Sequence, residues 1–119
     1  MSHPLKVYND AKELSVKVST KLLPLLPDKA NRLKHEIRAK NKSILRSINI
    51  GYEQQLLPDQ FSKCIDLVLR DIDEVMTMLQ EIHKEYCLHA SQDFVYDLIR
   101  KYNRLGKDLC ILVRYVSKK

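Results

Sequence analysis

The sequence DQFSKCIDLVLRDIDEVMTMLQEIHKEY occupies residues 59–86 and directly follows Pro58. Apolar side chains recur in it at every third or fourth position, which is the spacing that places them on one face of an α-helix. The stretch therefore predicts a long, well-buried helix. Its apolar face consists of Phe61, Ile65, Val68, Ile72, Val75, Leu79 and Ile82.

Three further segments have helical periodicity. Pro24 and Pro27 end the segment 5–23. Asp28 is a suitable N-cap residue for the segment 28–53, and Ser91 for the last segment, 91–119. Gly51 marks the approximate end of the segment 28–53. Short connections make consecutive helices antiparallel, so the sequence predicts a single all-α domain over residues 1–119, an up-down-up-down antiparallel four-helix bundle. The three segments are residues 5–23, 28–53 and 91–119.

The composition is that of an ordinary globular protein, with 45% hydrophobic and 30% charged residues among 119. No apolar run approaches the roughly 18 residues of a membrane span, and none resembles a signal-peptide core. We therefore predict a cytoplasmic protein without membrane association. The three cysteines are odd in number and irregularly spaced, which argues against a disulfide framework.

No motif for catalysis or cofactor binding is present. The chain lacks a glycine-rich phosphate loop, a His-Glu-x-x-His pair and a nucleophile elbow. The nearest approach to a metal site is His83, Cys87 and His89, of which only His83 and Cys87 share a helical face. The sequence therefore predicts a protein that is not an enzyme, with no catalytic residue, no metal and no cofactor.

The net charge of +6 is distributed unevenly along the chain. Residues 1–54 hold eleven Lys/Arg against five Asp/Glu, and residues 90–119 hold seven against three. Residues 55–89 reverse the balance, with three against seven. This distribution suits either an anionic partner or pairing between helices of opposite charge.

A cation recurs every fourth residue in the second helix. The apolar stripe of this helix predicts that the cations lie on its opposite face. Each pair of like charges at this spacing weakens an isolated helix by a few tenths of a kcal/mol. An acidic partner would offset that cost. Successive cations are about 6 Å apart along the helix, close to the phosphate spacing of a nucleic-acid strand. The cation ladder, as we name it, consists of Lys34, Arg38, Lys42 and Arg46, and the stripe of Leu33, Ile37, Ile44 and Ile48.

A second basic surface is expected on the last helix, where Arg100, Arg104, Lys107 and Arg114 fall within roughly one quadrant. Two basic helix faces predict contact with the phosphate backbone of RNA or DNA without base recognition. The few scattered tyrosines do not support base stacking.

An alternative function is a protein-interaction scaffold, in which the ladder pairs with an acidic partner or with the acidic third helix of a neighbouring subunit. Pairing with the third helix within one chain would also neutralise the ladder. Six of its carboxylates are the candidates for this pairing, Asp59, Asp66 and Asp73 at intervals of seven residues and Glu74, Glu81 and Glu85 nearby.

Two positions do not fit the helix patterns. Gly106 lies inside the last helix, where glycine costs about 0.5–1 kcal/mol relative to alanine, and close helix packing within the bundle or between subunits is the favoured explanation over a hinge. Lys40 lies at the edge of the apolar stripe, where only its aliphatic stem is expected to be buried.

Short motifs at both ends and in the second helix resemble a known family. The opening pattern L-x-V-Y-x-x-A-x-x-L and the spacing of Ile37-Arg38, Ser43-Ile44, Ile48 and Gly51-Tyr52 resemble the four-helix-bundle proteins encoded in intervening sequences of bacterial large-subunit ribosomal RNA genes. Leu105-Gly106-x-x-Leu109 is similar to the pattern of that family's last helix.

The same superfamily includes the accessory variability determinant of diversity-generating retroelements, a basic bundle that forms a pentameric barrel. The resemblance implies a homo-oligomer, a pentamer in that branch. It also implies that the chain works with a reverse transcriptase or with ribosomal RNA.

Overall fold

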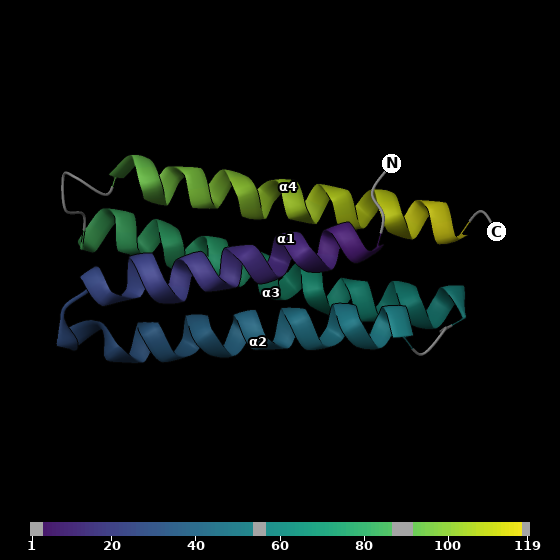
Figure 1. Ribbon diagram of the computed structural model, residues 1–119, viewed down its shortest axis with the longest axis horizontal. Helices are drawn as coiled ribbons and strands as arrows, with labels where there is room; N and C mark the ends of the chain where they lie inside the picture. The colour runs from purple at the N-terminus through teal and green to yellow at the C-terminus, as the bar shows by residue number, and fades with distance from the viewer. Residues whose placement is uncertain (1–3, 54–56, 87–91, 118–119) are drawn as a thin grey trace.

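The computed structural model describes residues 4–53, 57–86 and 92–117, which form four long α-helices and no strand. The helices pack side by side in a body that measures 47 × 23 × 19 Å (Figure 1). The predicted all-α class is confirmed. None of the helices in these ranges is long and apolar enough to cross a membrane. Their bounds are α1, Pro4–Lys17; α2, Asn31–Glu53; α3, Pro58–Glu85; and α4, Gln92–Ser117.

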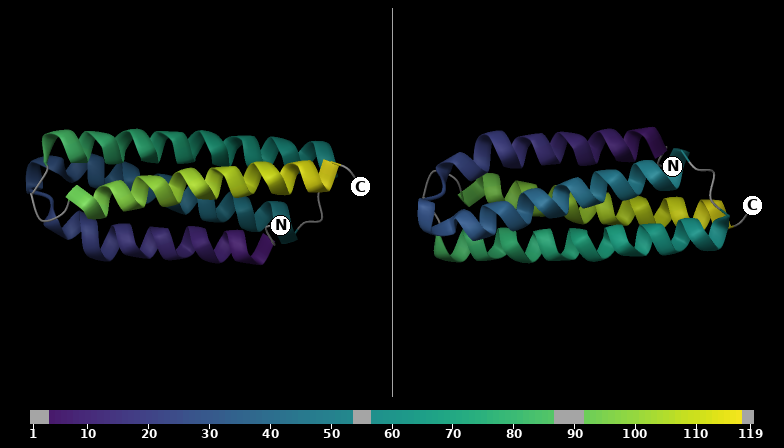
Figure 2. Two further views of the ribbon diagram at one scale, coloured as in Figure 1. Left: turned by 90° about the horizontal axis from the view of Figure 1, so that it is seen from above. Right: turned by 90° about the horizontal axis from the view of Figure 1, so that it is seen from below.

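Helices α2 and α4 lie at diagonally opposite corners of the bundle. Helix α3 packs against both of them, and α1 packs against the same two. In Figure 2, α4 is nearest the reader in the view from above and α2 in the view from below. The outward faces of α2 and α4 therefore point to opposite sides of the molecule.

Contacts between α3 and α4 run in opposite senses along the two helices. The rings of His83 and Tyr96 lie 4.3 Å apart between centroids near one end. Further along, Gly106 lies against Leu69 and Ile72. Residue numbers on α4 thus rise as those on α3 fall, so the two helices are antiparallel.

The core is formed by the apolar stripes that periodicity identifies. All seven residues of the α3 stripe are buried, as are Ile37, Ile44 and Ile48 on α2, whereas Leu33 is half-buried. Removing such side chains from water is the main favourable contribution to folding, about 25 cal/mol per Å² of apolar surface. On α4 the buried apolar residues, which we name the α4 stripe, are Val95, Leu98, Tyr102, Leu105, Leu109 and Leu112.

The first predicted helix is shorter than expected. Its α-helical part ends at Lys17, and a π-helical turn, Val18–Leu22, and a 3₁₀ turn, Leu23–Leu25, follow. Pro24 has no N–H and cannot continue the hydrogen-bond ladder, so the regular α-helix stops before it.

The two predicted N-caps have different outcomes. Asp28 is not an N-cap, because Pro27 occupies that position before a 3₁₀ turn, Asp28–Ala30, and no side chain caps it. Asp28 instead lies in the first turn, where a carboxylate interacts favourably with the helix dipole. Ser91 lies outside the described residues.

Helix α2 ends at Glu53, as the segment 28–53 predicts, and Gly51 lies inside its last turn. Gly51 is buried, and a Cβ atom there would lie 3.4 Å from the ring of Phe61 on α3, at the lower limit of ordinary van der Waals contact. The end of α2 therefore packs closely against Phe61.

One polar pair lies inside the apolar core. The Tyr102 hydroxyl donates a 2.7 Å hydrogen bond to Asn41 Oδ1, and the two residues are 1% and 3% exposed. Asn41 Nδ2 is buried without a partner among the described residues. Burial raises the pKa of Tyr102 well above its ordinary value, so the hydroxyl stays protonated and donates. The pair joins the diagonal helices α2 and α4 through the centre of the bundle.

Candidate nucleic-acid interface

The cation ladder follows the outer side of α2 but rotates around it. Four residues turn an α-helix by about 40° more than one full revolution, so each successive cation is displaced around the axis. Lys34 is half-buried at the flank away from α3, whereas Arg38, Lys42 and Arg46 are exposed. The ladder thus begins beside the core and ends on the solvent side.

The second basic set lies on the outer side of α4. Arg100, Arg104, Lys107 and Arg114 are all exposed, on the side of the helix opposite Leu98 and Leu105. Since α2 and α4 are diagonal, the ladder and this set face opposite sides of one chain (Figure 2). They do not form a single continuous cradle within the chain, and the two surfaces would contact separate stretches of a strand.

The carboxylates of α3 that pair with α2 contact Lys40 rather than the ladder. Lys40 Nζ lies 3.4 Å from Asp71 Oδ1 and 2.5 Å from Glu74 Oε2. Its side chain is 34% exposed, which agrees with burial of the stem alone. The hydrogen bond to Glu74 raises the pKa of Lys40 above its ordinary value. Lys40 contacts residues 71 and 74, and the Ser47 carbonyl accepts a hydrogen bond from Cys64 Sγ. Residue numbers on α3 thus fall as those on α2 rise, so α2 and α3 are antiparallel.

We predict that Lys40→Glu lowers the free energy of unfolding by about 1–2 kcal/mol, because it removes two ion pairs and places a third carboxylate beside Asp71 and Glu74. Because the pKa of Lys40 is raised in the folded state, the stability that this shift contributes is present at neutral pH and is lost as the pH rises through the raised pKa. Urea denaturation at pH 7 measures the change.

Lys42→Glu is the matched control, since Lys42 is exposed on the same helix and has no acidic side chain within 4 Å among the described residues. The control should shift stability by no more than about 0.5 kcal/mol. Equal losses in the two variants would contradict a specific role for the Lys40 pairs.

Four other cations are paired within their own helices. These pairs join residues four apart, at N–O distances between 2.8 and 3.2 Å. In contrast, none of the eight ladder and α4 cations lies within 4 Å of an acidic side chain that the structure describes. Their charges are therefore available to a partner. The paired residues are Lys6 with Asp10, Lys17 with Glu13, Arg32 with Glu36, and Lys101 with Asp97.

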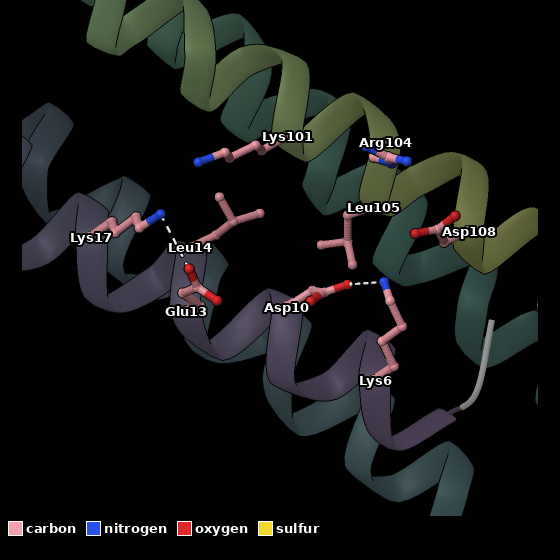
Figure 3. Close-up of a pocket in the computed structure, with 9 residues that line it drawn as sticks. All are labelled: Lys6, Asp10, Glu13, Leu14, Lys17, Lys101, Arg104, Leu105 and Asp108. Carbon is pink, nitrogen blue, oxygen red and sulfur yellow. Dashed lines mark hydrogen bonds and ion pairs between the residues drawn. The ribbon is translucent and has the colours of Figure 1, made fainter.

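A charged groove between α1 and α4 extends the α4 surface. Figure 3 shows Lys17 and Lys101 reaching toward one another across Leu14, with Arg104 further along α4. Lys6 and Lys17 are bound to carboxylates of α1, so within this groove Arg104 is the cation without an ion pair to a described residue. Arg104 thus belongs to the outer α4 surface rather than to the paired network.

The described residues contain no group of three or more His, Cys, Asp or Glu side chains placed to hold a metal ion. Cys87 and His89 lie outside the described residues. The ring of His83 packs against Tyr96, and its Nε2 atom is buried without a partner among the described residues.

Comparisons of the chain with models of protein families, with curated proteins and with solved structures give no match.

Proposed function

We propose that the chain is a non-enzymatic protein that binds the phosphate backbone of RNA or DNA through the cation ladder on α2 and the basic set on α4. The observation that carries the proposal is the grouping of unpaired cations on the outer faces of two helices. Five cations are held by carboxylates of the chain, while the eight proposed binding residues are exposed or half-exposed and have none within 4 Å among the described residues. Six further described cations also have no ion pair to a described residue, but they lie outside these two sets.

Binding of this kind is electrostatic and independent of sequence. A cation that neutralises a phosphate releases a condensed counterion, so affinity falls steeply with salt concentration. The ladder's cation spacing of about 6 Å along the helix lets neighbouring cations contact successive or alternate phosphates. The outer faces of α2 and α4 carry charge rather than rows of aromatic rings, which favours contact with the backbone over base stacking.

The family resemblance extends the proposal. The antiparallel contacts of α3 with both α2 and α4 support an up-down-up-down four-helix bundle. The ribosomal RNA intervening-sequence proteins and the accessory variability determinant, which the sequence motifs resemble, are also four-helix bundles. We therefore propose a homo-oligomeric accessory protein that works with a reverse transcriptase or with ribosomal RNA.

The test is a salt titration of binding to fluorescently labelled single- and double-stranded RNA and DNA of mixed sequence. We expect the wild type to lose roughly 10³-fold in affinity between 50 and 200 mM salt if about six phosphates are contacted. Replacing all four ladder cations by Glu should weaken binding at least 100-fold at 50 mM salt and flatten the salt dependence. Comparison of the four nucleic acids also distinguishes RNA from DNA and single strands from duplexes.

A charge-matched control separates the ladder from net charge. Replacing Lys12, Lys21, Lys63 and Arg70 by Glu changes the net charge equally, and all four are exposed outside both basic surfaces. This control should retain most of the wild-type affinity. Loss of binding to the same extent in both variants, or no binding by the wild type at 50 mM salt, would refute the proposed interface. Absence of binding by the wild type would make the protein-interaction scaffold the better candidate function.

A further inference from the structure

An open groove runs between α3 and α4 on the side of the bundle away from α1 and α2. Its floor is apolar, with buried Ile72 and half-buried Leu69 and Met76 on α3. On α4, Gly106 lies beside exposed Cys110, and Ile111 is 44% exposed at the edge. The groove thus presents apolar surface that the chain itself leaves uncovered.

Packing within the chain does not require Gly106. A Cβ atom added there would lie 3.7 Å from Leu69 Cδ2 and 4.0 Å from Ile72 Cγ2, which are ordinary van der Waals contacts. Alanine would therefore fit and would favour the helix by about 0.5–1 kcal/mol. Close packing inside the bundle is thus not the reason for this glycine. A helix from outside the chain that packs into the groove would be a reason, because glycine lets the backbones approach closely.

Charges of opposite sign follow the two sides of the groove at matching intervals. Asp73 on α3 and Lys107 and Arg114 on α4 are exposed and line the groove. Asp66 is exposed seven residues before Asp73 on the same side of α3, but it does not itself line the groove, and neither does exposed Arg70. Because the helices are antiparallel, a step of seven residues forward on α4 matches seven backward on α3. None of the two aspartates and two cations is in an ion pair within 4 Å with another described residue.

We propose that this groove is the contact between two copies of the chain, related by a two-fold axis that runs parallel to the helices. That axis places α3 of each copy over α4 of the other and keeps every residue at its own height along the bundle. Asp73 and Lys107 line the same stretch of groove, so each would meet its opposite from the other copy. A two-fold axis across the helices would instead place α3 over α3, with like charges opposed.

The proposal goes beyond nucleic-acid binding and revises one part of it, because Lys107 and Arg114 belong to both surfaces. In the pair these two cations are covered, so the phosphate-binding set is reduced to the ladder with Arg100 and Arg104. Self-association is measured without nucleic acid, so the two proposals can fail separately. The pair would be isologous, so one surface supplies both halves of the interface.

Reversing the charges on one edge of the groove at a time tests the proposal. The first variant, Lys107→Glu with Arg114→Glu, has two acidic edges, and the second, Asp66→Lys with Asp73→Lys, has two basic edges. Light scattering after size exclusion should give a mass of two copies for the wild type. Each variant alone should self-associate at least tenfold more weakly, and an equimolar mixture should recover the pair, because every contact in the mixed pair joins opposite charges.

Arg100→Glu with Arg104→Glu is the matched control, since it makes the same charge change on α4 outside the groove. It should leave the self-association unchanged, and circular dichroism should show the same helix content in all variants. A wild type that remains a single copy up to 100 µM, a mass of five copies that no edge variant changes, or a mixture that fails to recover association would each overturn the proposal.

Thiol labelling gives a second measurement. Cys110 is exposed in the groove, whereas Cys64 is half-buried, donates a hydrogen bond to the Ser47 carbonyl and has its pKa raised by burial. With Cys87 replaced by Ser, labelling of Cys110 should slow at least threefold as the protein concentration rises through the association range. Cys64 should not change, and a Cys110 rate independent of concentration while the pair forms would contradict the proposed contact.

Discussion

Replacing Tyr102 by Phe should lower the free energy of unfolding by about 1–3 kcal/mol, although the ring that fills the core is retained. The hydroxyl donates the 2.7 Å hydrogen bond to Asn41 Oδ1 in a site almost without solvent. Its loss leaves a buried amide with neither polar atom satisfied, and such a group carries its full desolvation cost. Chemical denaturation followed by circular dichroism at 222 nm measures the change.

The double variant Asn41→Leu with Tyr102→Phe shows whether the cost lies in the unsatisfied amide. It removes both polar groups and should be within about 1 kcal/mol of the wild type, or more stable, because Asn41 Nδ2 already lacks a partner among the described residues. A double variant as stable as the wild type would mean that the polar pair contributes to the alignment of α2 with α4 more than to stability. Additive losses from the two single substitutions would contradict this account.

Truncation of Leu98 to Ala should cost about 2–5 kcal/mol, the usual range for a fully buried leucine. The side chain is 0% exposed on the core face of α4, where close packing limits how far its neighbours can move into the space it leaves. A loss of this size is a large fraction of the stability of a small domain and should lower its melting temperature by at least 8 °C.

Ile111→Ala on the same helix is the control for that prediction. Ile111 is 44% exposed at the edge of the groove, so its truncation should cost no more than about 1 kcal/mol at concentrations where the chain is a single copy. Equal losses at positions 98 and 111 would mean that the apolar stripe does not define the core of α4.

Periodicity predicted the core because helical geometry links spacing to side-chain direction. The seven residues of the α3 stripe are all buried, and the bounds of α3 differ from the prediction by one residue at each end. The stripe of α2 also contains the signal of a buried polar residue. Ile37 and Ile44 leave a gap at position 41, where the pattern requires a core residue, and Asn41 occupies it. A polar residue at such a position signals a buried hydrogen bond, but its partner could not be identified from spacing.

The ends of the helices were predicted less well because they depend on local backbone geometry. Prolines correctly limited the first helix, but the π-helical and 3₁₀ turns over residues 18–25 have no signature in the apolar pattern. Gly51 marked the end of the second helix to within two residues, but its close packing against Phe61 of α3 could not be predicted from spacing.

The sequence by itself determined which residues face the core and which cations share a helix face, because both follow from the rotation of about 100° per residue. Only the tertiary structure decided which charges pair between helices. Lys40 contacts the carboxylates of α3, while the ladder beside it meets none among the described residues, since pairing depends on which flank faces a neighbouring helix. The diagonal placement of α2 and α4, which separates the two basic surfaces, also depends on contacts between helices far apart in the chain.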